Sequence, residues 1–205
     1  MEKDTYKTIL EASPDSLFKE KGSKFIGYAF PVSDENQVKE YITQLKKEHY
    51  NARHWCYAWQ MGTSYENYRV NDDGEPSNSA GMPIFGQLQS YDVTNVLIVV
   101  VRYFGGTKLG VGGLMQAYKT AAKMSLESSK IVEKTIDAYF ILKFDYPEMN
   151  IVMRIIKEEK LFLLSQKMEL NCKFKLAVRK KDAERIYALF QNTYKVSIKK
   201  VSSII

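Results

Sequence analysis

The longest uninterrupted apolar run in the chain is VLIVVV, at residues 96–101. It is far shorter than the ~18–20 residues that a membrane-spanning helix needs. A short run rich in β-branched residues is instead typical of a buried strand. With an apolar fraction of 45%, the sequence predicts a folded protein without a membrane partner rather than a disordered chain.

A glycine-rich segment, GGTKLGVGG at residues 105–113, follows this strand. It does not fit the Walker A motif, because Val111 and Gly112 stand where Lys and Ser or Thr are required. A dinucleotide-binding fingerprint read from Gly110 also fails, because its last glycine position is Met115. Nucleotide-driven catalysis is therefore not favoured.

The same segment could hold an anion, since glycines ahead of a helix let backbone N–H groups converge. A helix is predicted near residues 114–129, and nearby cations add positive charge. The candidate phosphate-binding residues are Lys24, His54, Arg102, Gly105, Gly106, Lys108, Gly110, Gly112 and Gly113. Alternatively, the glycines only permit positive φ and close packing of helix on strand.

An acidic turn, NDDGEPSNSAG at residues 71–81, gives a second group of candidates: Asp72, Asp73, Glu75 and Ser77. It is not an EF-hand loop, because the alternating ligands and the distal Glu are missing. Paired carboxylates could do acid–base work. A turn in which Ser77 or Ser79 caps a helix at residues 80–88 explains the segment without chemistry, and we favour it.

His54 and Cys56 fall on one side of a predicted strand. A nucleophilic Cys–His pair needs contact and a third orienting group, which neighbours at i and i+2 seldom provide. A half-buried strand is favoured. Cys56 and Cys172 lack metal-binding spacing, so we expect free thiols rather than a zinc site or a disulfide. The sequence offers no metal cluster or nucleophile triad, so we also expect no catalytic residue, no metal and no cofactor.

The first part of the chain reads as strands within residues 5–12, 16–32 and 53–61, with a helix over residues 33–50. Ser33 is the expected N-cap of that helix, and His49 is expected to contact its last carbonyls. A polar interval then restarts the pattern. Residues 136–205 read as strand, helix, two strands, helix and strand, which is the ferredoxin-like order. The sequence therefore predicts an α+β protein with domains at 1–131 and 132–205.

The net charge of +6 arises in the second domain. Residues 1–131 carry 15 basic and 15 acidic side chains, whereas residues 132–205 carry 15 and 9. The C-terminal basic run comprises Arg179, Lys180, Lys181, Arg185, Lys195, Lys199 and Lys200. No aromatic platform accompanies this run, so a solvated face is favoured, with a modest attraction to RNA.

Four stretches in order, at residues 21–32, 52–59, 71–84 and 99–118, resemble the YigZ/IMPACT family, which carries the Impact N-terminal domain. The resemblance implies an N-terminal domain similar to the second domain of a small-subunit ribosomal protein. It also implies a ferredoxin-like domain similar to the last domains of translocase elongation factors. Those relatives are largely nucleic-acid or ribosome binders, the eukaryotic members regulate translation through a kinase activator, and no catalytic activity is established for the bacterial members.

The chain departs from the family pattern at two points. Residues 78–81 are Asn-Ser-Ala-Gly where the family usually has Gly-Thr-Ala-Gly, and Gln116 stands where Arg is frequent. Asn tolerates left-handed geometry, so the turn can survive. Gln116 in place of Arg removes one potential phosphate contact.

These observations lead us to expect a non-enzymatic cytoplasmic protein that binds RNA, the ribosome or a protein partner of the translation machinery. The N-terminus has no apolar signal core, so secretion is not expected. One alternative is an enzyme or binding protein for a phosphorylated small molecule, at a cleft between the acidic turn and the glycine segment. Another is a protein–protein interaction module.

Overall fold

The computed structural model describes residues 4–201, which form two compact units. The N-terminal unit spans Tyr6–Lys134. The C-terminal unit contains the chain from Thr135 together with Asp4 and Thr5. Asp4 is held there by the N–H of Ile136, which donates to its carbonyl at 2.8 Å. The division at 1–131 and 132–205 remains our prediction for the domains.

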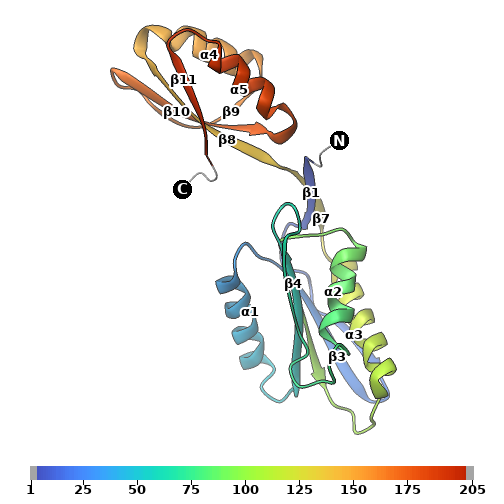
Figure 1. The fold of residues 1–205 in the computed structure, drawn as a ribbon. Helices are drawn as coiled ribbons and strands as arrows, with labels where there is room; N and C mark the ends of the chain where they lie inside the picture. The colour runs from blue at the N-terminus through green and yellow to red at the C-terminus, as the bar shows by residue number, and fades with distance from the viewer. Residues whose placement is uncertain (1–3, 202–205) are drawn as a thin grey trace. The chain divides into compact units, whose positions relative to one another are not determined.

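The N-terminal unit is built on a five-stranded antiparallel sheet in the order β2-β3-β6-β4-β5 (Figure 1). Its strands are β2 (Ser16–Glu20), β3 (Ser23–Pro31), β4 (His54–Met61), β5 (Asn67–Asn71) and β6 (Val96–Tyr103). The apolar run predicted to be a buried strand is β6, the central strand. Helices cover both faces of the sheet.

The two faces of the sheet have separate cores. Side chains of β6 at 96, 98 and 100 pack with α2 (Gly81–Ser90) and α3 (Gly110–Glu127). Those at 97, 99 and 101 pack on the face of α1 (Glu35–Glu48). Two further strands, β1 (Thr5–Ile9) and β7 (Ile131–Thr135), pair with each other in a separate two-stranded sheet.

The C-terminal unit has the predicted β-α-β-β-α-β order. Its elements are β8 (Asp137–Asp145), α4 (Met149–Glu158), β9 (Phe162–Lys167), β10 (Asn171–Arg179), α5 (Ala183–Gln191) and β11 (Val196–Val201), with 3-10 turns η1 (Tyr146–Glu148) and η2 (Lys180–Asp182). The sheet order β11-β8-β10-β9 is ferredoxin-like. Both helices pack on one face (Figure 1). The α+β fold class predicted from the sequence is confirmed.

The predictions for the ends of α1 and α3 are wrong at two points and met only in part at His49. The N-cap of α1 is Asp34 rather than Ser33, because the Asp34 carboxylate accepts from the N–H groups of Asn36 and Gln37. The ring of His49 hydrogen-bonds the hydroxyls of Tyr28 and Tyr103 at 2.7 and 2.9 Å, and only its backbone N–H reaches a helix carbonyl.

The other wrong prediction at a helix end concerns the start of α3. The helix begins at Gly110 rather than near residue 114. Gly112 and Gly113 therefore belong to its first turn instead of the loop before it. In the part of the chain that the structure describes, no helix is long and apolar enough to cross a membrane.

Candidate functional site

Four loops meet at one end of the N-terminal sheet, which we call the loop end. They are residues 21–22, 49–53, 72–80 and 104–109. The antiparallel pairing brings them together, because β3 and β4 begin where β5 and β6 finish. The acidic turn and the glycine segment are therefore neighbours in space (Figure 1).

Asp72 holds the acidic turn closed. Its Oδ1 accepts from the N–H groups of Ala80 and Gly81 at 2.9 and 2.8 Å, and its Oδ2 from that of Asn78 at 2.9 Å. Ala80, the N-cap of α2, has no side-chain oxygen of its own to satisfy these donors. The expected cap by Ser77 or Ser79 is therefore wrong: the Ser79 hydroxyl donates to the carbonyl of Pro76 instead, and Ser77 is exposed.

Asp73 ties the same turn to the start of β4. Its Oδ2 accepts from the backbone N–H of Trp55 at 2.7 Å, and Lys46 Nζ lies 3.8 Å from its Oδ1. His54 Nδ1 donates to the Asp73 carbonyl oxygen at 2.8 Å. Left-handed backbone at Asp73 (φ 42°) and Gly74 (φ 85°) turns the chain back to make these contacts.

Glu75 joins the turn to the sheet and to α3. Its side chain is 4% exposed, and its Oε1 accepts from Arg102 Nη1 at 2.5 Å and from the Tyr118 hydroxyl at 2.7 Å. His54 Nε2 lies 3.9 Å from the same oxygen. The three acceptor carboxylates of the turn thus all have partners inside the protein.

Arg102 lies beneath this end of the molecule rather than on it. It is 5% exposed, and its guanidinium carbon lies 5.4 Å from the ring centre of Phe25 and 5.5 Å from that of Phe104. Within residues 4–201, its Nε has no hydrogen-bond partner. Because Glu75 balances its charge, the exposed positive charge of the loop end comes from other side chains.

Cys56 is a buried thiol at the back of this network. Its Sγ lies 3.0 Å from the Asp72 carbonyl oxygen and 3.3 Å from the Tyr118 hydroxyl. Burial raises the pKa of Cys56, and nearby carboxylates raise it further despite the Tyr118 contact. Burial also raises the pKa of Tyr118. A protonated thiol is a poor nucleophile, so the geometry favours a structural role.

The glycines differ in what they do. A Cβ on Gly105 would stand 1.9 Å from the carbonyl carbon of Gly22, so Gly105 is required for packing. Gly106 (φ +87°) and Gly110 (φ +72°) adopt left-handed backbone. Gly112 has neither constraint, since it lies in a helix and a Cβ there would meet nothing within 4 Å. Neither packing nor backbone conformation therefore explains why residue 112 is a glycine.

The N-terminus of α3 is open beside these glycines. Leu109 is its N-cap and provides no side-chain hydrogen bond. Lys108 precedes it and is exposed. Unpaired N–H groups and the helix dipole favour an anion at such a position.

Strand register separates the candidate cations. Phe25, Arg102 and His54 stand opposite one another across three strands, on the face of α2 and α3. Lys24 is paired with Tyr103 and lies on the α1 face. The sequence did not single out Tyr118, whose helical spacing is that of an ordinary core residue.

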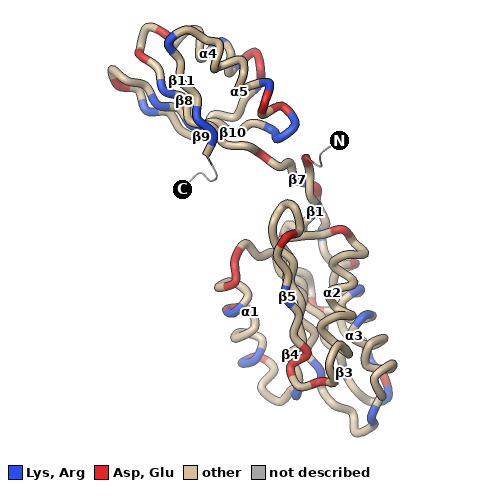
Figure 2. The backbone as a smooth tube through the Cα atoms, viewed as in Figure 1, with Lys and Arg blue, Asp and Glu red and all other residues tan. Residues whose placement is uncertain are grey.

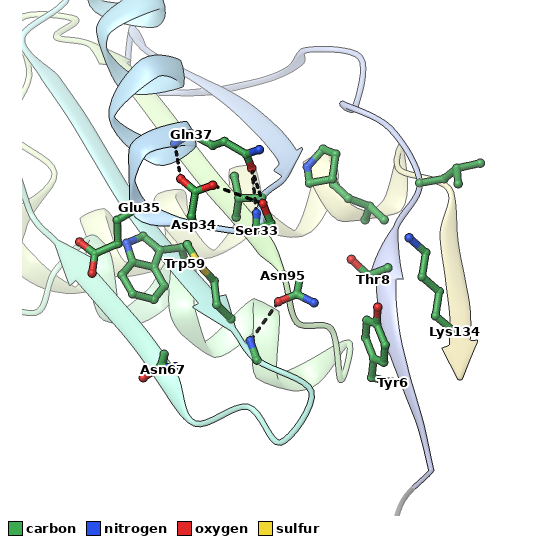
Figure 3. Close-up of a pocket in the computed structure, with 16 residues that line it drawn as sticks. Tyr6, Thr8, Ser33, Asp34, Glu35, Gln37, Trp59, Asn67, Asn95 and Lys134 are labelled. Carbon is green, nitrogen blue, oxygen red and sulfur yellow. Dashed lines mark hydrogen bonds between the residues drawn. The ribbon is translucent and has the colours of Figure 1, made fainter. Parts of the chain in front are cut away.

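A pocket of about 790 Å³ lies at the opposite end of the N-terminal unit (Figure 3). None of the predicted site residues lines it. Several of its polar groups are occupied: the Asp34 carboxylate caps α1, and Asn95 Oδ1 accepts from the N–H of Gly62 at 2.9 Å. Among residues 4–201, no group of His, Cys, Asp and Glu side chains could hold a metal ion.

Comparison with known proteins identifies the family of the chain. The family model of the Impact N-terminal domain matches residues 21–126, which include the whole loop end. IMPACT family member YvyE of Bacillus subtilis is 34% identical over 178 residues, covering 87% of this chain and 82% of the relative. IMPACT family member YigZ of Escherichia coli is 33% identical over 145 residues, covering 69% and 71%. 

A crystal structure described as that of a hypothetical protein matches 98% of this chain and 99% of its own, with a TM-score of 0.73 and 22% identity. That likeness concerns the fold. The matched domain, and the extent of the match to the Bacillus relative, place the chain by sequence: it belongs to the IMPACT family.

Proposed function

We propose that this chain is a non-enzymatic, cytoplasmic protein of the translation machinery that binds RNA or a ribosome-associated partner, and that the loop end holds a phosphate group. The observation that carries the proposal is the open N-terminus of α3, with Gly112 unobstructed and Lys108 exposed beside it. The YigZ/IMPACT resemblance, with its nucleic-acid-binding and translation-regulating relatives, points the same way.

In this proposal the backbone makes the main contact. The N–H groups around Gly110 and Gly112 bind the phosphate oxygens, and Lys108 adds a charge-assisted hydrogen bond. The absence of a Cβ at Gly106, Gly110 and Gly112 lets a nucleic-acid backbone approach closely. Arg102 and His54 do not contact the phosphate; they hold Glu75 in position beneath the loop end.

We propose no chemistry for the acidic turn. Asp72 closes the turn, Asp73 anchors it to β4 and Glu75 neutralises Arg102. Each carboxylate has a structural partner that accounts for it. These contacts favour binding over catalysis on a phosphorylated small molecule.

Binding is tested by fluorescence anisotropy with a labelled fragment of ribosomal RNA, across a series of salt concentrations. Lys108→Gln should weaken binding roughly fivefold at 0.1 M salt and lower the salt slope by about 0.7–0.9, the effect of one phosphate contact. Lys119→Gln, an exposed lysine further along α3, is the matched control.

Gly112→Ala separates binding from folding. Alanine is the better helix former by up to about 1 kcal/mol, so the variant should be at least as stable as the parent while binding more weakly. Gly86→Ala is the matched control, because Gly86 lies in α2 and a Cβ there also meets nothing within 4 Å. Equal binding by the parent, Gly112→Ala and Lys108→Gln would refute the proposed site.

A further inference from the structure

The sheet of the C-terminal unit has a face that neither of its helices covers. Along β8 and β10, buried side chains such as Phe144 and Phe174, which pack against α4 and α5, alternate with side chains that are exposed or half-buried, apart from the buried Ala177. The alternate positions therefore point away from the helices. We call them the open sheet face: Tyr139, Ile141, Lys143, Phe162, Ser165, Lys167, Lys173, Lys175, Ala177, Ser197 and Lys199.

Three lysines of this face form a row across adjacent strands. Lys173 stands directly opposite Lys143 on β8 and directly opposite Lys167 on β9. Side chains at opposed positions have Cβ atoms about 4.5–5.5 Å apart, and like charges there destabilise a sheet. Solubility alone does not require this arrangement, because lysines and carboxylates in alternation would serve equally well.

Two of the three lysines in this row have no carboxylate partner among the described residues. Lys167 pairs with Glu169 at 2.9 Å, with both side chains largely exposed. Within the described chain, no carboxylate lies within ion-pair distance of Lys143, Lys173 or Lys199. Figure 2 shows the basic residues gathered along these strands.

A hollow of about 660 Å³ lies at the lysine end of the sheet. Four lysines line it, against two carboxylates. The lysines are Lys143, Lys167, Lys173 and Lys195, and the carboxylates are Asp145 and Glu169. The hollow therefore has the size and the charge to receive a phosphate group and its sugar.

Aromatic side chains lie further along the same face. Phe162 is 69% exposed and stands opposite Ala177, whose partner on the other side is Tyr139. Ala177 is buried and Tyr139 is half-buried, so Phe162 is the more exposed of the two rings. An exposed ring on the same face as lysines offers a surface on which a base can stack while phosphates are neutralised. Apart from Lys199, the lysines of the open sheet face lie outside the C-terminal basic run, to which the expectation of no aromatic platform applies.

We propose that the open sheet face docks single-stranded nucleic acid, with phosphates on its lysines and bases against Phe162 and Tyr139. A polyanion would relieve the repulsion between the opposed lysines, and this favours it over an apolar partner. The proposal does not depend on the loop end, which belongs to the other unit and uses other residues.

The test uses the full chain and fluorescein-labelled 20-nucleotide strands, U20 and dT20, by anisotropy against salt concentration. The triple variant Lys143→Gln/Lys173→Gln/Lys199→Gln should weaken binding roughly 100-fold at 0.1 M salt and lower the salt slope by about 2, since each single-strand phosphate contact contributes about 0.7. The control Lys157→Gln/Lys181→Gln/Lys200→Gln makes the same charge change in the same unit and should bind like the parent.

Phe162→Ala gives an independent readout. Loss of one stacked base should weaken binding at least about fivefold while leaving the salt slope unchanged. Circular dichroism melting of each variant shows whether the unit remains folded. Equal binding of U20 and dT20 indicates recognition of phosphates and bases, whereas a preference for U20 indicates contacts to the 2′-hydroxyl; both support the proposal.

Three results would overturn it. One is equal weakening by the triple variant and its control, which would mean that net charge alone matters. Another is equal competition by polyglutamate, which would mean that any polyanion suffices. The third is binding that Lys108→Gln reduces but neither the triple variant nor Phe162→Ala changes; that result would leave the loop-end proposal intact.

Discussion

Removing the negative charge of Glu75 should destabilise the N-terminal unit strongly. The side chain is buried at 4% exposure and accepts from Arg102 and Tyr118. In Glu75→Gln the shape is kept and the amide oxygen can still accept a hydrogen bond. The guanidinium of Arg102, however, becomes a buried cation without a counter-charge.

The size of the effect follows from this geometry. Breaking a buried ion pair by removing one partner costs about 3–5 kcal/mol. Because glutamine retains one acceptor, we expect the lower end, about 3 kcal/mol. The double variant Glu75→Gln/Arg102→Met removes the unpaired charge as well, so it should be more stable than Glu75→Gln alone.

Urea unfolding followed by tryptophan fluorescence isolates this unit. The chain has two tryptophans, Trp55 and Trp59, and both lie on β4. With a urea dependence of about 2 kcal/mol per molar, the loss should lower the unfolding midpoint by about 1.5 M. Glu127→Gln is the control, because its pair with Lys123 is half exposed and contributes about 0.5 kcal/mol or less.

The reasoning would be refuted if Glu75→Gln unfolded within 0.5 kcal/mol of the parent, on the order of the exposed control. The reasoning would also fail if the loss of stability in the double variant equalled the sum of the losses in Glu75→Gln and in Arg102→Met. That result would show that the two side chains act independently.

Three further predictions use the same urea titration. Asp72→Ala loses the hydrogen bonds that close the turn and cap α2, so it should lower the free energy of unfolding by about 1–2 kcal/mol. Asp72→Asn should recover part of this stability. An unchanged free energy of unfolding in Asp72→Ala would show that the cap contributes nothing. Gly105→Ala should destabilise the unit severely because the added Cβ would overlap Gly22, whereas Gly112→Ala should not destabilise it. Equal destabilisation by the two variants would contradict the conclusion that Gly105 is required for packing and Gly112 is not. Burial raises the pKa of Tyr28 to about 12, with smaller contributions from Asp15, Glu48 and Tyr103, so the folded state holds this proton more tightly than the unfolded chain does. Stability from Tyr28 should be complete below about pH 10 and decline as the pH rises through 12; Tyr28→Phe should show a smaller alkaline decline, and an unchanged decline would refute the assignment.

Most strands and helices could be predicted because their apolar residues repeat at the spacing of a buried face. Strand β5 could not, since three of its five residues are exposed and it joins the sheet through backbone pairing with β4. The sequence predicts the start of α3 too late because Gly110 and Gly112 are weak helix formers. Here the local sequence preference is overridden by the packing of the rest of the helix.

The side-chain contacts within the site could not be predicted from the sequence. Glu75 and Arg102 are 27 positions apart, and Glu75 and Tyr118 are 43 apart. Their contact depends on the order of strands in the sheet. Similarly, the lysine row of the C-terminal unit is produced by the register between β8, β9 and β10, and only Lys199 of the open sheet face belongs to the basic run noticed in the sequence.

The acidic turn and the glycine segment work as one assembly, although their roles differ. Glu75 bonds Arg102, three residues before Gly105, and Tyr118 in the helix that the glycines begin. The turn thus holds both the strand and the helix on either side of residues 104–109. Gly105 fixes the same loop from the other side, by packing against the β2–β3 turn at Gly22. A loop anchored at both ends can keep the N-terminus of α3 open without a capping side chain, which supports the proposal that the carboxylates hold the loop in place while the backbone binds the phosphate.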